Sequence, residues 1–343
     1  MKKIVALMMA ITIVFIGASL PQPAQAEEWA YQDTVTVAAV NFNPVPGDRA
    51  ANLEKIKDFT IKAANQGANI ILFPEIALTG IFPPEAVADV AETIPGPSTE
   101  GVAKLAAQYN VYVIFGMVER DGDVFHNSAA VIGPTGLLGV YRKVHPIEFM
   151  EPWTTKGEEF PLFETPYGPI GVGICYDTYC FPEVARSYAV RGVRLFFNPT
   201  AFPNFPDCED YREFYMNALG TRAVENQMFV VSSNIVGECG GVPFFGYSAI
   251  FGPKPGCMNY HVFAGPASET EEEIVLATLD LTSVERLPAA VATILKDRNP
   301  EVYIHLVSGV LPNGTAYTII GICAAAALVF LGLWLWERKR KVS

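Results

Sequence analysis

Three side chains in the sequence are together sufficient for amide hydrolysis, and each of them follows an extended segment. Glu75 comes after the apolar run 70–73, and Lys143 lies near the end of the run 137–144. Cys175 ends a third such run. A carboxylate can accept a thiol proton, an ammonium group can stabilise a thiolate and a developing oxyanion, and a thiolate attacks carbonyl carbon. Because sites in open α/β sheets gather at strand ends, we expect the three side chains to meet.

The segment around Cys175 predicts a thiol at the turn from a strand into a helix. Residues 171–175 are apolar or glycine, and Pro182 is placed to open a helix. A sharp strand-to-helix turn holds a side chain above a rigid sheet, which is the geometry that a nucleophile needs. A buried free cysteine is the alternative interpretation, since cysteine is among the most buried residue types.

The body of the chain alternates predicted strands with predicted helices. Apolar runs bounded by turn residues predict the strands, and apolar residues spaced three or four apart predict the helices. This alternation indicates an α/β fold, and the hairpin turn at residues 133–136 indicates a mixed sheet. The predicted strands are 34–40, 70–73, 111–119, 127–132, 137–144, 171–175, 194–198, 228–234, 248–252 and 274–281, and the predicted helices are 49–66, 99–109, 183–190 and 209–227.

Three motifs in this order resemble the signature blocks of the nitrilase superfamily of carbon-nitrogen hydrolases. They are Pro74-Glu75 with Thr79-Gly80, Tyr141-Arg-Lys143-Val-His, and Gly171-Val-Gly-Ile-Cys175-Tyr-Asp. The resemblance extends over about residues 35–303. It implies a four-layer αββα sandwich with two mixed β-sheets, and a homodimer that pairs through its helical faces.

The resemblance also implies a role for each matching residue. Glu75 corresponds to the general base, and Cys175 to the nucleophile that forms a thioester. Lys143 and the backbone N–H of Tyr176 correspond to the oxyanion site, which is usually the largest electrostatic contribution to such chemistry. Glu151 matches a second glutamate that positions the lysine and the substrate.

Several polar residues near these motifs have competing interpretations. Glu148 competes with Glu151, because the alignment between Pro146 and Pro152 could slip. Arg222 and Glu225 are interpreted as a structural pair behind the site, and Asp177 and Glu183 as structural too. His126 and His145 lack a set of metal-ligand partners, and the chemistry requires neither a metal nor a cofactor.

The residues after the nucleophile favour one reaction. Nitrile-hydrolysing members of the superfamily usually carry Trp-Glu there, whereas this chain has Tyr176-Asp177, which favours the amidase or carbamoylase branch. N-acyl transfer through the same three residues and nitrile hydrolysis are the alternatives. A binding module that has only kept the fold would be expected to lack Glu75, Lys143 or Cys175.

Six aromatic residues are candidates for the substrate pocket, each with a core position as the alternative. Their apolar character and the acidic surface favour a small amide substrate that is uncharged or cationic. They are Phe149, Trp153, Phe202, Phe205, Phe244 and Phe245.

The charge of the chain argues against nucleic acid as a partner. The 343 residues carry a formal net charge of −12, and the basic residues at the two ends make the remainder more acidic still. Phosphate backbones are bound by basic surfaces.

The N-terminus has the three parts of a secretory signal. Lys2 and Lys3 precede the apolar run 4–20, and Ala24-Gln-Ala26 forms a small-residue cleavage site. We therefore expect a signal peptide at 1–26 and a catalytic domain at 27–303.

The C-terminus predicts one transmembrane helix. Residues 316–336 are apolar and uncharged, and their number is close to the ~20 residues that a membrane-spanning helix needs. Residues 304–315 are the expected linker, and the basic tail 337–343 favours the cytoplasmic side, which places the domain outside the cell. Residues 311–315 resemble the cell-wall sorting signal Leu-Pro-x-Thr-Gly with its last two residues transposed.

The six cysteines divide by location. Cys323 lies in the predicted span and Cys175 is the candidate nucleophile, which leaves four that permit three pairings in an oxidising compartment. Cys239 with Cys257 and Cys180 with Cys208 is one solution, and free thiols are another. Since Cys175 must stay reduced, we expect Cys180 to point away from the pocket.

Overall fold

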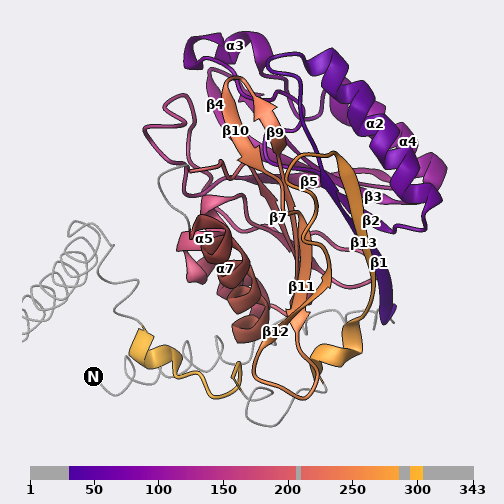
Figure 1. The fold of residues 1–343 in the computed structure, drawn as a ribbon, viewed down its shortest axis with the longest axis vertical. Coiled ribbons are helices and arrows are strands. Elements are labelled where there is room, and N and C mark those ends of the chain that lie inside the picture. Colours follow the sequence, from indigo (N-terminus) through magenta and orange to yellow (C-terminus); the bar gives the residue numbers. More distant parts are fainter. Residues whose placement is uncertain (1–30, 206–209, 286–293, 304–343) are drawn as a thin grey trace, which may run out of the picture. The chain divides into compact units, whose positions relative to one another are not determined.

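Two β-sheets form the centre of the protein (Figure 1). The computed structural model describes residues 31–205, 210–285 and 294–303. The chain divides into two units, Met1–Leu295 and Lys296–Ser343, and both sheets belong to the first.

The first sheet combines parallel and antiparallel strands, as the sequence predicts. Its parallel strands are β1 (Thr34–Asn41), β2 (Ile70–Leu72) and β3 (Tyr112–Asp121). The hairpin of β4 (Val124–Gly133) with β5 (Gly136–Arg142) continues the sheet antiparallel to β3. The strand β13 (Glu273–Asp280) pairs antiparallel with β1 at the other edge. Because β5 runs in the same direction as β2, the C-terminal ends of both strands lie at the same edge of the sheet. The residues that follow these two ends form part of the site.

The second sheet has the order β12-β11-β8-β7-β6. Three of its strands are parallel: β6 (Ile170–Val172), β7 (Leu195–Thr200) and β8 (Phe229–Asn234). The antiparallel strands β11 (Ala249–Pro253) and β12 (Tyr260–Ala264) complete it.

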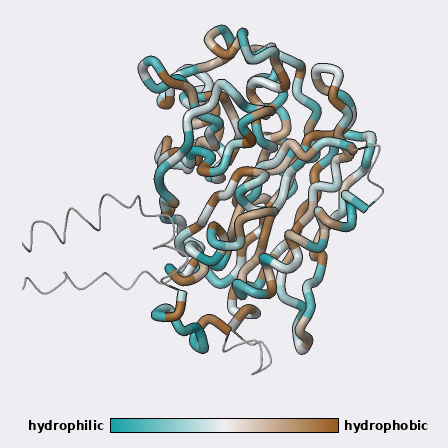
Figure 2. The backbone as a smooth tube through the Cα atoms, turned by 90° about the vertical axis from the view of Figure 1, so that its left-hand side faces the viewer, coloured by the Kyte–Doolittle hydropathy of each residue, from teal (hydrophilic) through white to brown (hydrophobic). Residues whose placement is uncertain are grey.

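The two sheets pack against each other, and helices cover their outer faces. Alternate residues of β1 point to opposite faces of the first sheet. Val37 and Ala39 belong to the core shared with the second sheet. Ala38 belongs to the core beneath the helices α2 (Arg49–Asn65) and α4 (Pro97–Tyr109). Such alternation follows from the period of two in a strand. The result is four layers in the order helix, sheet, sheet, helix, and Figure 2 shows hydrophobic stretches running along the strands inside the body.

The second sheet is covered by two helices. They are α6 (Pro182–Ala189), which begins at the proline that the sequence indicates, and α7 (Tyr211–Asn226). Buried residues of both helices share the core with β6, β7 and β8. The short helix α5 (Tyr176–Cys180) precedes α6.

Some short elements are absent from the sequence prediction. The helices α3 (Val87–Val90) and α5 are too short to show a helical period. The hairpin of β9 (Val236–Cys239) with β10 (Val242–Phe245) turns at two glycines, and its strands have four residues each. The strand β12 is also missing from the prediction, since its five residues are mostly half-buried and show no clear alternation.

The predictions for the two chain ends concern residues that the structure does not describe. Within the described ranges, no helix is long and apolar enough to cross a membrane. The predicted signal peptide 1–26, linker 304–315, span 316–336 and tail 337–343 lie outside the described residues.

Of the alternatives left open for the cysteines, the structure has free thiols and not the Cys239–Cys257 disulfide. Both residues are free thiols, as are Cys175 and Cys180. Cys239 is buried in the β9–β10 sheet, where its Sγ accepts a hydrogen bond from the Ile81 N–H at 3.3 Å, whereas Cys257 lies in the turn between β11 and β12. Cys208 and Cys323 lie outside the described residues.

Candidate active site

Glu75 lies just beyond β2 in a tight turn. The next residue, Ile76, has a positive φ of 48°, and Gly116 of β3 lies so close that a Cβ built on it would be 2.6 Å from the Glu75 Cα. The Glu75 side chain is 4% exposed. One carboxylate oxygen, Oε2, accepts a hydrogen bond from the Ala201 N–H at 2.9 Å, which ties the turn to the loop after β7.

Lys143 follows β5 and reaches the same point from the neighbouring hairpin. Its side chain is 2% exposed. The Nζ donates to Glu75 Oε1 at 2.7 Å and to both oxygens of Glu151 at 2.9 Å. The structure therefore brings these three residues together as the sequence predicts. Glu148 is exposed, so Glu151 and not Glu148 is the second glutamate at the lysine.

Cys175 occupies the turn from β6 into α5. Its φ of 49° and ψ of −108° are rarely adopted by a side-chain-bearing residue, which is the strained turn typical of exposed nucleophiles. Its N–H donates to the Pro199 carbonyl at 2.9 Å. Tyr176 is the first residue of α5, and the first N–H groups of a helix have no partner within the helix.

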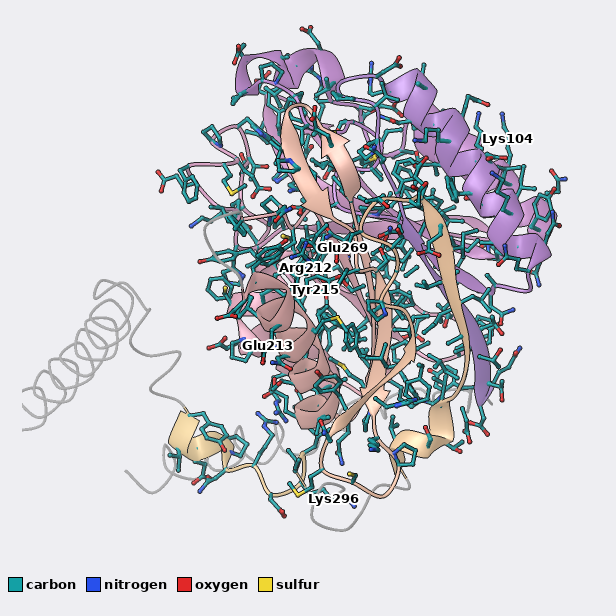
Figure 3. The ribbon with its side chains drawn as sticks, in the orientation of Figure 1. Lys104, Arg212, Glu213, Tyr215, Glu269 and Lys296 are labelled. Atoms are coloured by element: carbon teal, nitrogen blue, oxygen red, sulfur yellow. The ribbon has the colours of Figure 1, made fainter. Side chains whose placement is uncertain are left out.

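A polar network beneath α5 fixes this turn. Asn198 of β7 donates from Nδ2 to the Gly173 carbonyl at 2.8 Å, and its Oδ1 accepts from the Tyr179 hydroxyl at 2.9 Å. Ser232 of β8 also donates to Asn198 Oδ1 at 2.9 Å and lies 2.9 Å from the hydroxyl of Tyr215. Figure 3 labels Tyr215 and Arg212 on α7, and Arg212 forms an ion pair with Glu269.

Arg222 and Asp177 have the structural roles that the sequence indicates. Arg222 donates to the carbonyls of Thr178 and Tyr179 at 2.9 and 3.2 Å, and so satisfies the end of α5. Asp177 is fully buried and accepts from the Tyr141 hydroxyl at 2.7 Å and from the His145 N–H at 2.8 Å. These contacts join α5 to the strand and loop that carry Lys143.

Asn127 is a site residue that the sequence reasoning missed. Its Nδ2 donates to Glu75 Oε1 at 2.7 Å and to Glu151 Oε1 at 2.6 Å. Its carbonyl accepts from the Lys143 N–H at 2.8 Å, so β4 places it beside the lysine. Counting back from the turn at 133–136 brings the start of β4 near the end of β5, but a register shift between Val131 and Ile132 decides which residue lies beside Lys143.

Burial and charge set the protonation of the site. Burial and the Glu75 charge raise the pKa of the Cys175 thiol well above its usual value, although Lys143 opposes this. Burial lowers the pKa of Lys143, but Glu75 and Glu151 outweigh it and raise that pKa overall. Burial also raises the pKa of Glu151. At neutral pH the thiol is therefore protonated and the lysine is charged.

A cavity of about 310 Å³ opens above these groups. It is lined by Glu75, Lys143, Glu151, Cys175 and Tyr176, and by four of the aromatic residues that the sequence proposes, Trp153, Phe202, Phe205 and Phe244. In the ranges described, no cluster of His, Cys, Asp and Glu is arranged to hold a metal ion.

Two predictions about the cavity are wrong, those for Phe149 and Cys180, and Phe245 takes the core position that was its alternative. Phe149 is 85% exposed and is not part of the lining, because its loop turns it to solvent. Phe245 is buried in the core, where it packs on Tyr215 and Tyr211. Cys180, the last residue of α5, lines the cavity instead of pointing away from it.

The chain is similar to known carbon-nitrogen hydrolases over most of its length. The family model described as carbon-nitrogen hydrolase matches residues 36–289. A nitrilase of Pyrococcus abyssi is 35% identical over 279 residues, which cover 78% of this chain and 99% of that protein. An omega-amidase of Mus musculus is 32% identical over 271 residues, which cover 74% of this chain and 92% of that protein.

Solved structures show the same fold. A crystal structure of an amidase from Nesterenkonia sp. superposes with a TM-score of 0.67 at 23% identity, covering 80% of this chain and 97% of that one. The resemblance of the three sequence motifs is thereby confirmed. The chain belongs to the carbon-nitrogen hydrolase family of the nitrilase superfamily, and it is an enzyme of the amidase type.

Proposed function

We propose that this enzyme hydrolyses a small-molecule amide, at a carbon-nitrogen bond other than a peptide bond, through a thioester on Cys175. The observation that carries the proposal is the contact of the Lys143 ammonium with Glu75 and Glu151 in the cavity that also exposes Cys175. A thiol, a buried base and a fixed cation in one cavity are the groups that acyl transfer to a nucleophile requires.

In the first half of the reaction, Glu75 accepts the thiol proton while Cys175 Sγ bonds to the amide carbon. The carbonyl oxygen becomes an oxyanion, which the Lys143 ammonium and the Tyr176 N–H stabilise. The carbon-nitrogen bond then breaks, and Glu75 returns its proton to the leaving nitrogen. Ammonia or an amine departs, and the acyl group remains as a thioester.

In the second half, water replaces the amine. Glu75 takes one proton from water, the resulting hydroxide attacks the thioester carbon, and the sulfur leaves as a thiolate that recovers the proton. The net reaction consumes one amide and one water and releases one acid and one amine. Glu151 and Asn127 act by holding Lys143 and Glu75 in place, since both contact them directly.

The test is ammonia release from simple primary amides by the purified full-length protein. We expect Cys175→Ala to abolish turnover and Cys175 to carry the acyl group as a mass adduct in wild-type protein that is quenched with acid. Cys257→Ala is the matched control, since Cys257 is a free thiol that does not line the cavity. Wild-type turnover by Cys175→Ala would sink the mechanism.

Nitrile hydrolysis is a second candidate, because the relative from Pyrococcus abyssi is named a nitrilase. Sulfur addition to a nitrile carbon would need the same cation and base. Assaying each amide beside the nitrile of equal carbon skeleton separates the two activities.

We also propose that the enzyme is exported and anchored to the cell membrane with its catalytic domain outside, as a homodimer. The signal-like residues 1–26, the apolar run 316–336 and the basic tail support the location. The dimer rests on the resemblance to the superfamily alone.

A further inference from the structure

The cavity above Cys175 has a polar floor and apolar walls. Among the described residues that line it, the charged side chains are Glu75, Lys143 and Glu151. The Lys143 ammonium already donates to both carboxyl groups. The cation of the floor serves the two carboxyl groups and the developing oxyanion, and no second cation lines the described part of the cavity to receive a negatively charged acyl group.

The walls are two groups of aromatic residues. In the first, Phe82 and Trp153 pack with ring centroids 5.3 Å apart. In the second, Phe202 makes ring contacts with Tyr179 at 5.1 Å and with Phe205 at 5.7 Å. Because each ring is held by another, the walls are ordered before a substrate arrives, which lowers the entropic cost of binding.

The chemistry of the floor orients the substrate. The amide oxygen must face Lys143 and the Tyr176 N–H, and the leaving nitrogen must face Glu75 to receive its proton. The acyl group is the remaining substituent on the carbonyl carbon. It has to lie along the aromatic walls, since the amide oxygen and nitrogen occupy the positions beside the polar groups of the floor.

We propose that the substrate is a primary amide of an uncharged, bulky apolar acid, and that the enzyme discriminates against acyl groups that carry a carboxylate. This inference rests on the proposed amide hydrolysis. A cavity of about 310 Å³ is within the range of small-molecule sites, roughly 300–1,000 Å³. Each buried methylene favours binding by roughly fourfold, whereas a carboxylate would be buried without a cation beside two other carboxyl groups.

The experiment measures kcat/KM of the full-length protein for a set of amides. Acetamide, butanamide and hexanamide vary the length, and pentanamide and succinamate match in size but differ in charge. We expect kcat/KM to rise by roughly tenfold or more from acetamide to hexanamide, and succinamate to fall at least roughly tenfold below pentanamide. N-Hexylacetamide, with its apolar group on the nitrogen, should be a poorer substrate than hexanamide.

Two variants test the walls. Trp153→Ala should lower kcat/KM for hexanamide by several-fold more than for acetamide. The matched control is Phe149→Ala, because Phe149 is an exposed aromatic residue of the same loop outside the lining. Val242→Arg places a cation on the half-buried lining and should raise the rate for succinamate relative to pentanamide, which keeps the test open if Trp153→Ala does not fold.

The outcomes separate this inference from the function on which it rests. Turnover of amides with a preference for succinamate, or with equal kcat/KM along the aliphatic series, overturns the inference and leaves amide hydrolysis intact. Turnover of none of the amides by folded protein overturns the proposed function, and the inference with it.

Discussion

Asn127 holds the two carboxyl groups of the site at a fixed distance from Lys143. It donates to Glu75 and Glu151 from a single nitrogen, and its main chain pairs with Lys143. Hydrogen bonds to charged groups contribute about 1.5–3 kcal/mol each. We therefore expect Asn127→Ala to lower kcat by roughly 10- to 100-fold with a smaller effect on KM, measured by steady-state kinetics.

The control for this substitution is Asn52→Ala. Asn52 is also a fully buried asparagine, but it bonds to the backbone of Val45 and Leu78 away from the cavity. It should lower Tm and leave the kcat of the folded enzyme unchanged. If Asn127→Ala lowers Tm but keeps the wild-type kcat, Asn127 has only a structural role.

The thiol of Cys175 should behave as an unactivated thiol in the free enzyme. Burial and Glu75 raise its pKa above the usual value, so the thiolate fraction at any given pH is smaller than for a free cysteine. In a Cys180→Ala background, alkylation of Cys175 by N-ethylmaleimide should accelerate by about tenfold per pH unit from about pH 6 to about pH 9, without a plateau. Site-resolved mass spectrometry gives the rate, and a plateau below about pH 7 would show a stabilised thiolate instead.

The reactive residues could be predicted from sequence because their chemistry is unusual at strand ends. Glu75, Lys143 and Cys175 meet as expected, and Glu151 joins them. An irregular loop lacks the periodicity of a helix or strand, so the sequence does not show in which direction each of its side chains points. Phe149 was therefore assigned to the pocket wrongly, for sequence does not state which way a loop turns.

At the scale of elements, β3 approaches the turn that carries Glu75 very closely. A Cβ on Gly116 would lie 2.4 Å from the Ile76 nitrogen and 2.6 Å from the Glu75 Cα, too close for any real contact. Gly116→Ala should therefore move Glu75, destabilise the protein by about 1–3 kcal/mol or more, and lower kcat by at least roughly tenfold. Thermal unfolding and kinetics measure the two effects.

Gly101→Ala is the matched control. Gly101 lies inside α4, and the nearest atom to a Cβ there is the flexible Lys57 Cε at 3.4 Å. Alanine favours a helix over glycine by up to about 1 kcal/mol, so Tm should stay equal or rise while kcat is unchanged. Wild-type Tm and kcat in Gly116→Ala would contradict the packing argument.

The elements differ in how far sequence could predict them. The helix α2 and the strand β1 show clear periods, and the structure has them within one or two residues of the predicted bounds. The helix α5 has five residues and β9 has four, which is shorter than either period can reveal. Asn127 could have been placed by pairing two predicted strands, but only once their register was known.

At the scale of the whole molecule, the proposed export and anchoring of the enzyme rest on the sequences of the two chain ends. In a bacterial host we expect the full-length protein in the membrane fraction, with its catalytic domain open to added protease in intact cells. Deleting residues 304–343 should release active enzyme into the medium or periplasm, while deleting residues 2–26 should keep it inside the cell. Full-length enzyme in the soluble cytoplasmic fraction would contradict the predicted export.

The position of Cys180 offers a way to observe this enzyme without turnover. It is an exposed free thiol at the wall of the cavity, on the same short helix that begins at the nucleophile. An environment-sensitive fluorophore attached there in the Cys175→Ala variant would change its emission when a ligand displaces water around it. The same thiol is an anchor for a covalent inhibitor that fills the cavity and leaves the nucleophile untouched.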